Sequence, residues 1–196
     1  MKKFLILISL LSITLVSYSQ AKVELGLKGG LNMAKISSDE SAVDLSNKTG
    51  YHFGVYGLIK VASIGIQPEI LYSTKGTEVS VASLSQDFSQ EYSYLDIPVM
   101  LKLYTIAGLN VQAGPQFGML LSTSGKNPDG TSISKSDFKD SDVSAAFGLG
   151  WDAPFGLNVT ARYILGLSDI SSDGTTENKN RMFQLSLGYK LFGLGK

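Results

Sequence analysis

The chain has 196 residues, of which 43% are hydrophobic, with 17 basic and 17 acidic residues, one histidine and no cysteine. The absence of cysteine excludes a lipoprotein anchor, a disulfide scaffold, thiol catalysis and cysteine-bound metals. The numbers of basic and acidic residues are equal, and the basic residues form no cluster along the sequence. Nucleic acid is therefore not an expected partner.

The N-terminus has the pattern of a secretory signal peptide. Two lysines precede an apolar run over 4–16, and small serines flank Tyr18. The run is shorter than the roughly 20 residues of a membrane-spanning helix, and its flanks are those of a cleaved leader. We expect cleavage after Ser19, so that residues 1–19 are a signal peptide and residues 20–196 form a single domain.

Eight later segments alternate apolar and polar residues, and the apolar positions of all eight are free of charge. Successive side chains of a strand point to opposite faces, so each segment is predicted to be a strand with one apolar face. The segments span 23–33, 51–59, 64–72, 95–103, 109–121, 143–151, 157–167 and 183–191. Strands of about 10 to 12 residues cross the hydrocarbon of a membrane when tilted. The pattern predicts an all-β fold, an eight-stranded antiparallel up-and-down transmembrane β-barrel.

The connections between these segments alternate in length. Long polar connections are predicted at 35–49, 76–90, 122–141 and 168–180, and short ones at 61–63, 104–108 and 153–156. Long surface loops alternating with tight periplasmic turns are typical of outer-membrane barrels. We therefore expect four surface loops and both chain ends in the periplasm.

Three prolines fall inside the predicted strands, at Pro68, Pro98 and Pro115. Proline cannot donate a ladder hydrogen bond, and a closed barrel has no edge strand to hold it. We expect a β-bulge or a missing ladder bond at each of these positions.

Aromatic residues gather near the ends of the segments, as in the interfacial girdles of membrane barrels. The short-turn group is Tyr104, Trp151, Phe155, Tyr189 and Phe192, and the long-loop group is Tyr51, Phe53, Tyr72, Tyr92, Tyr94 and Phe183.

The polar positions are predicted to face the barrel interior. A Lys or Arg facing the lipid midplane costs about 2–4 kcal/mol, and no charge occupies the apolar face. The interior of eight strands is only wide enough to be filled by side chains, and glycines at polar positions leave room for long neighbours. Buried charges need partners, so we expect an interior polar network that closes the barrel to solutes. Its predicted members are Glu24, Lys28, Glu69, Asp96, Lys102 and Arg162.

Several stretches resemble the outer-membrane β-barrel domain family of Bacteroidota, labelled PorT-like or porin-family and allied in shape to the OmpX and OmpA barrels. The similarity rests on residues 25–32, 94–102, 148–150, 162–167 and 183–190, and YLDIPVMLK at 94–102 is the most specific of them. The resemblance implies an outer-membrane barrel without shared catalytic residues.

No motif predicts catalysis, a metal site or a cofactor site. His52 is the only histidine, no Gly-x-Ser-x-Gly elbow is present, and we interpret His52 as a hydrogen-bonded interior or rim residue. Acidic residues in or beside 122–141 lack the spacing of a calcium loop and are interpreted as solvated; they are Asp129, Asp137, Asp140 and Asp142.

The predicted function is that of a non-enzymatic, monomeric outer-membrane protein. Its closed barrel contacts the lipid bilayer and offers four surface loops to a protein partner. Two alternatives stay open at this point: a component of a protein-secretion apparatus, as the PorT label suggests, and a soluble periplasmic barrel that carries a lipid.

Overall fold

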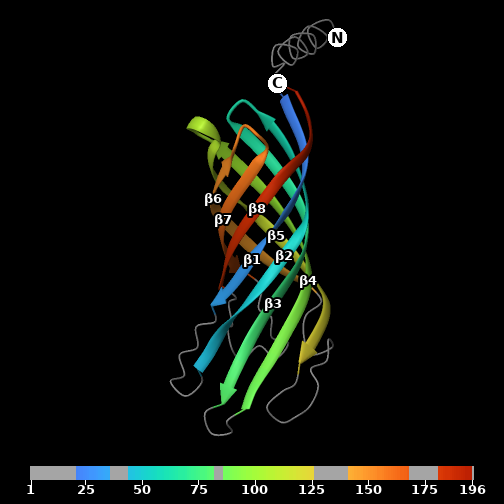
Figure 1. Cartoon of the computed structure of the whole chain (residues 1–196), viewed down its shortest axis with the longest axis vertical. Coiled ribbons are helices and arrows are strands. Elements are labelled where there is room, and N and C mark those ends of the chain that lie inside the picture. Colours follow the sequence, from blue (N-terminus) through green and yellow to red (C-terminus); the bar gives the residue numbers. More distant parts are fainter. Residues whose placement is uncertain (1–20, 36–43, 82–85, 126–140, 168–180, 196) are drawn as a thin grey trace, which may run out of the picture.

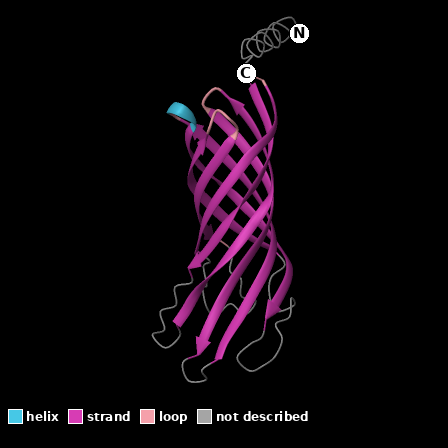
Figure 2. Cartoon of the chain, viewed as in Figure 1, coloured by secondary structure: helices cyan, strands magenta, loops and turns pink. Residues whose placement is uncertain are grey.

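Eight antiparallel strands form a closed barrel in the computed structural model of the chain (Figures 1 and 2). The structure describes residues 21–35, 44–81, 86–125, 141–167 and 181–195, so the expected signal peptide lies outside the described residues. The strands are β1 (Ala21–Lys35), β2 (Asp44–Val61), β3 (Ile64–Val81), β4 (Gln86–Tyr104), β5 (Leu109–Gly125), β6 (Ser141–Asp152), β7 (Leu157–Gly166) and β8 (Arg181–Leu194). The predicted fold class is confirmed.

The barrel closes because β1 pairs with β8 as well as with β2. Lys28 in β1 is the register partner of Gly54 on one side and of Gly188 on the other. Each strand therefore has a hydrogen-bonded neighbour on both sides. In the part of the chain that is described, no helix has the length and apolar character needed to cross a membrane.

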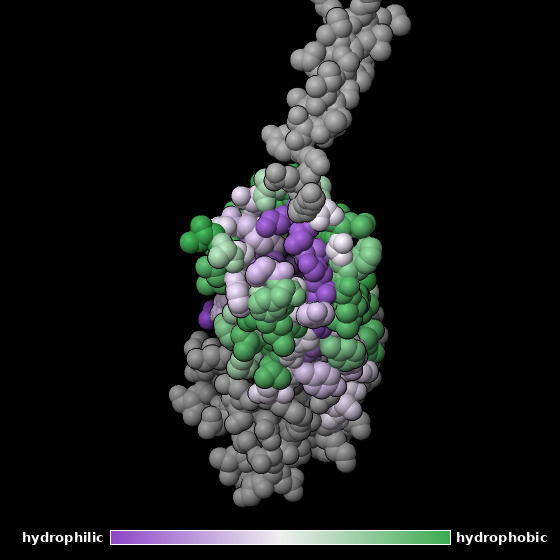
Figure 3. Space-filling view, turned by 45° about the horizontal axis from the view of Figure 1, so that its top comes forward, coloured by the Kyte–Doolittle hydropathy of each residue, from purple (hydrophilic) through white to green (hydrophobic). Residues whose placement is uncertain are grey.

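The apolar face of the strands points away from the barrel axis. Leu25, Leu149 and Leu187 are 56%, 64% and 57% exposed, and most of the other predicted apolar-face residues are exposed too. Figure 3 shows this surface as green flanks around a purple, hydrophilic region. The interior instead holds polar and charged side chains. A soluble barrel that carries a lipid would need the reverse arrangement, so that alternative is wrong.

The short connections lie where the sequence predicts them. They are residues 62–63, 105–108 and 153–156, and the second contains a single 3-10 turn, Ile106–Gly108. The Trp151 indole NH donates to the Ala107 carbonyl oxygen at 3.0 Å, which ties this turn to β6. We call this side of the barrel, where β1 begins and β8 ends (Figure 1), the short-turn end.

At the opposite, long-connection end, the strands are longer than predicted. β2 already begins at Asp44, and β3 and β4 run through most of the range 76–90. The backbones there pair in register from Gly76↔Glu91 to Val81↔Gln86. The prediction of a loop over 76–90 was wrong, because cross-strand backbone hydrogen bonds can continue where the apolar alternation has stopped.

The three prolines interrupt strand pairing without shifting its register. Between β3 and β4 the described partners run from Pro68↔Val99 directly to Leu71↔Asp96, and the positions between are skipped. Similar gaps flank Pro68 between β2 and β3, and Pro115 between β4 and β5. Of the two outcomes expected, missing ladder pairs are therefore the one that occurs. The register shifts lie elsewhere, at Leu25/Gly26, Lys48/His52 and Ser93/Tyr94.

Most aromatic residues of the predicted girdles lie on the outer face. Near the long-connection end the rings of Tyr51, Phe53 and Tyr72 form a cluster with centroids 5.3–6.5 Å apart. Near the short-turn end Trp151 meets Phe155 edge-on at 6.3 Å. The assignment of Tyr94 and Tyr104 was wrong: they are 5% and 8% exposed and point inward, with the polar positions of β4.

Candidate functional site: the polar interior and its short-turn mouth

The centre of the barrel interior is organised around one carboxylate, that of Glu69 in β3. Its Oε1 accepts from Lys28 Nζ at 2.6 Å and from Arg162 Nη2 at 2.5 Å. Its Oε2 accepts from Arg162 Nη1 at 2.8 Å, which makes the arginine contact bidentate. All three side chains are fully buried. Bidentate arginine–carboxylate pairs are among the strongest polar contacts in proteins, so this group fixes β1, β3 and β7 relative to one another.

Gln67 connects this group to a second carboxylate. Its amide nitrogen donates to Glu69 at 2.6 Å, and its amide oxygen accepts from Lys102 Nζ at 2.9 Å. Lys102 also donates to Asp152 at 2.9 and 3.1 Å. The Tyr104 hydroxyl donates to the same carboxylate at 2.5 Å, and the Asn158 amide donates to it as well. A continuous polar network thus runs from Lys28, in the centre of the interior, to Asp152 at the short-turn end.

Glycine positions make room for these long side chains. A Cβ on Gly148 would lie 2.8 Å from Cγ of Arg162, and a Cβ on Gly26 would lie 2.5 Å from the Tyr56 ring. Both distances are too short for real atoms, so Arg162 and Tyr56 occupy the space that a side chain at these glycines would need. Gln112 accepts from Arg162 Nε and Nη2 at 3.1 and 2.9 Å, which completes the guanidinium contacts.

The six predicted network residues fall into three groups. Lys28, Glu69, Lys102 and Arg162 belong to the central network described above. Glu24 lies at the short-turn end, 2.7 Å from Lys22 Nζ and 3.5 Å from Lys190 Nζ.

Asp96 lies toward the long-connection end, with Lys75 Nζ 3.4 Å from its Oδ1. No described residue provides a hydrogen-bond partner for its Oδ2. The network residues that sequence reasoning missed were Gln67, Gln112 and Asp152. Gln67 carried a signal, because it occupies a polar position of β3 in step with Glu69. Asp152 and Gln112 occupy polar positions of β6 and β5, two strands that hold no predicted member.

His52 is part of a separate polar chain in β1, β2 and β8. Its Nδ1 lies 2.9 Å from Asn32 Oδ1, and its Nε2 lies 2.9 Å from Ser186 Oγ. Because the Asn32 oxygen can only accept, Nδ1 carries the proton and Nε2 accepts from the Ser186 hydroxyl. This is the order of groups in a serine–histidine–aspartate triad, with Asn32 in the place of the aspartate. All three residues are at most 3% exposed, and none of them lines the pocket at the short-turn end.

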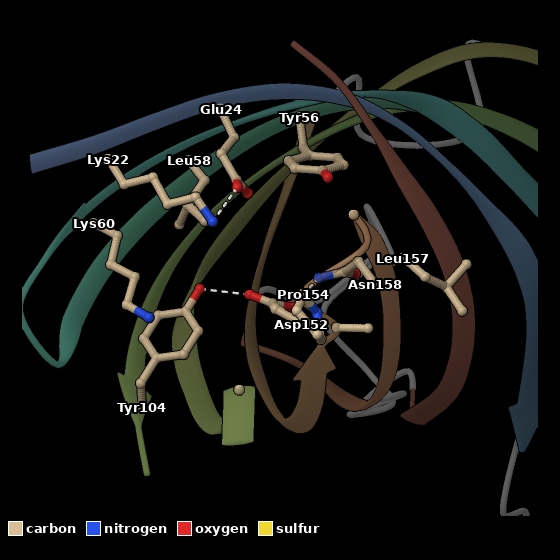
Figure 4. Close-up of a pocket in the computed structure, with 13 residues that line it drawn as sticks. Lys22, Glu24, Tyr56, Leu58, Lys60, Tyr104, Asp152, Pro154, Leu157 and Asn158 are labelled. Atoms are coloured by element: carbon tan, nitrogen blue, oxygen red, sulfur yellow. Dashed lines mark hydrogen bonds and ion pairs between the residues drawn. The ribbon is translucent and has the colours of Figure 1, made fainter. Parts of the chain in front are cut away.

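The short-turn end opens into a small polar pocket of roughly 70 Å³ (Figure 4). The residues that line it include Lys22, Glu24, Lys60, Tyr104 and Asp152. We call this region, together with Lys190, the short-turn mouth. Among the described residues, no group of three or more His, Cys, Asp and Glu is placed to hold a metal.

Removal of the Glu69 carboxylate is the most damaging single polar change expected in the interior. Glu69→Gln leaves Lys28 and Arg162 buried without a counter-charge, which costs about 3–5 kcal/mol. Chemical unfolding of the refolded barrel measures this loss. Glu24→Gln is the matched control, and because its partners reach solvent we expect a loss of about 1 kcal/mol or less.

The double variant Glu69→Gln/Lys28→Met, compared with both single variants, gives the coupling between the two residues. It should recover part of the stability lost in Glu69→Gln, because it removes one of the two unpaired cations. Equal losses in Glu69→Gln and Glu24→Gln would contradict the central place given to Glu69.

Comparison with known proteins agrees with this architecture. The chain is similar in structure to Neisserial surface protein A (TM-score 0.54, 11% identity), over 85% of this chain and 95% of that one. It is also similar to Ail, the attachment invasion locus protein of Yersinia pestis, in complex with the heparin analogue sucrose octasulfate. That match has a TM-score of 0.50 and 14% identity over 88% of this chain and 99% of the other. At such identities the likeness shows the fold alone.

No curated protein sequence matches the chain. A family model does: that of the outer membrane protein beta-barrel domain matches residues 18–172. The chain therefore belongs to the outer membrane protein β-barrel domain family, and its apolar outer face lies in the outer membrane.

Proposed function

We propose that this protein is a non-enzymatic, monomeric membrane platform whose barrel is closed to solutes. The observation that carries the proposal is the Glu69 group, which fills the middle of the interior with fully buried side chains from β1, β3 and β7. Lys102 and Gln67 occupy the neighbouring volume and are also fully buried. An eight-stranded barrel packed in this way leaves no path for a hydrated solute.

The buried position of His52 supports a role without catalysis. A hydrolase needs its nucleophile to reach a substrate and needs donors that stabilise the oxyanion. Ser186 is 3% exposed, and its hydroxyl is engaged by His52 inside the barrel. The Ser186–His52–Asn32 chain is therefore better suited to holding β1, β2 and β8 together than to acyl transfer.

The platform is the long-connection end, where β2 to β5 extend beyond their neighbours. Among the described residues, the pairing of β5 with β6 ends at Met119↔Ser141, whereas its pairing with β4 continues to Gly125↔Gln90. Among the described residues, 120–125 have no partner in β6, and we propose that an extended segment of a partner adds a strand there. We propose that this edge and the adjacent connections face the cell exterior.

A component of a protein-secretion apparatus is the second candidate function. It rests on the resemblance of residues 94–102 to PorT-like proteins. Deletion of the gene followed by assay of secreted cargo separates this candidate from a platform that has no role in secretion.

Conductance measurements test the closed interior. In planar bilayers we expect the refolded protein to give no stable channel openings. The variant Glu69→Ala/Arg162→Ala removes one charge of each sign together with two interior side chains. It should admit water and raise the conductance. Large, stable openings of the unaltered protein would contradict the proposal.

Cysteine labelling tests which end faces outward, and the absence of native cysteine makes it clean. Ser124 in β5 and Ser63 in a short turn are both exposed and lie at opposite ends. A membrane-impermeant maleimide should label Ser124→Cys on intact cells and label Ser63→Cys only after the outer membrane is permeabilised. The opposite pattern would overturn the orientation proposed here.

A further inference from the structure

The short-turn mouth carries a cation, Lys60, that forms no ion pair with any described carboxylate. Lys60 Nζ lies 3.7 Å above the centroid of the Tyr104 ring, and Figure 4 shows it pointing toward the pocket. Among the described residues, no carboxylate oxygen lies within ion-pair distance of it. Within the described part of the chain, the polar contact of Lys60 is with the face of an aromatic ring, which compensates an ammonium charge only in part.

A second lysine lies directly opposite Lys60. Lys22 in β1 and Lys60 in β2 are register partners, and both line the pocket. Cβ atoms of direct cross-strand partners are about 4.5–5.5 Å apart, and like charges in this arrangement are destabilising. The pair therefore favours a bound anion between or beside the two ammonium groups.

The two nearby carboxylates do not meet this demand. Glu24 is shared between Lys22 at 2.7 Å and Lys190 at 3.5 Å. Asp152 already accepts from Lys102 and from the Tyr104 hydroxyl, deeper in the barrel. Among the described residues, and with Asp152 balanced by Lys102, the mouth thus has three ammonium groups and one carboxylate, an excess of two positive charges.

We propose that the short-turn mouth binds a phosphate group, held chiefly by Lys60 with Lys22 beside it. A phosphate monoester carries about −1.5 to −2 charges at neutral pH, which matches the excess of two, whereas a carboxylate leaves one positive charge uncompensated. The roughly 70 Å³ pocket has room for a small anion but not for a large organic molecule. The phosphate is either a free ion or the exposed terminal group of a larger molecule such as a lipid head group. This inference does not depend on the proposed function.

Titration with inorganic phosphate tests the proposal. The protein is refolded in dodecyl maltoside, which is uncharged and free of phosphate, and the backbone amide shifts of Leu58 and Lys60 are followed by NMR at constant ionic strength. We expect saturable shifts, at least tenfold weaker binding in Lys60→Gln, and weaker binding of acetate than of phosphate. Arg181→Gln, which removes an exposed positive charge at the opposite end of β8, should bind phosphate like the unaltered protein.

Three results would overturn the proposal. They are the absence of saturable shifts, unaltered binding in Lys60→Gln, and equal loss in Lys60→Gln and Arg181→Gln, which would indicate a general charge effect. If Lys60→Gln does not fold, Lys22→Gln replaces it, because Glu24 keeps Lys190 as a partner. It should weaken binding severalfold, and unchanged binding would again contradict the site.

Nanodiscs separate the two sources of the phosphate group. If nanodiscs containing phosphatidic acid, whose head group is a phosphate monoester, reproduce the amide shifts without added phosphate, a lipid head group supplies it. If the shifts need added inorganic phosphate, the ligand is a soluble anion. Both outcomes support the site, and saturable binding that is lost in Lys60→Gln is required in either case.

Discussion

Closure of the sheet through the β1–β8 pairing is the constraint on which the rest of this structure depends. Hydrocarbon offers no hydrogen-bond partner, so a strand edge exposed to lipid costs several kcal/mol for each unpaired backbone group. Once β8 returns to β1, every strand is paired on both sides. The outer face is then free to be apolar, and the polar side chains are confined to the interior.

That confinement explains the chemistry of the interior. Charges within eight strands cannot reach bulk water, so each needs a partner from another strand. Glu69 meets this need for Lys28 and Arg162, and Asp152 meets it for Lys102. The network therefore joins strands that are not neighbours in the sheet, and the same side chains that stabilise the barrel also fill it.

At the short-turn mouth a charge does not need a partner of opposite charge, because solvent is near. Lys60 faces an aromatic ring instead of a carboxylate. An ammonium group without a carboxylate partner costs little free energy at a rim that water reaches. The same group would be strongly destabilising at the buried position of Glu69. Binding chemistry in this barrel is thus expected at the ends and not in the middle.

The alternation of residue types was enough to predict the eight strands, the short turns and the face that meets lipid. The same alternation placed Tyr94 and Tyr104 on the inward side of β4, but their aromatic character led to the wrong assignment to the girdles. Strand length could not be predicted at 77–81 and 86–91, because there the backbone pairing continues where the apolar alternation has stopped.

The sequence could not predict which interior charges pair with one another either. Glu69 and Arg162 are 93 residues apart, and their contact depends on the tilt and stagger of the strands around the closed barrel. The sequence marks which side chains point inward but not the height at which each one lies. For that reason Glu24 and Asp96 were grouped with residues from which the structure separates them.

The fluorescence of Trp151, the only tryptophan, tests most directly whether the apolar face meets lipid. Its side chain lies on the outer face near the short-turn end and is 38% exposed. In bilayers whose acyl chains are brominated near the head group, we predict strong quenching of this fluorescence, and little quenching by aqueous acrylamide. Efficient quenching by acrylamide with no effect of the brominated lipids would contradict the account.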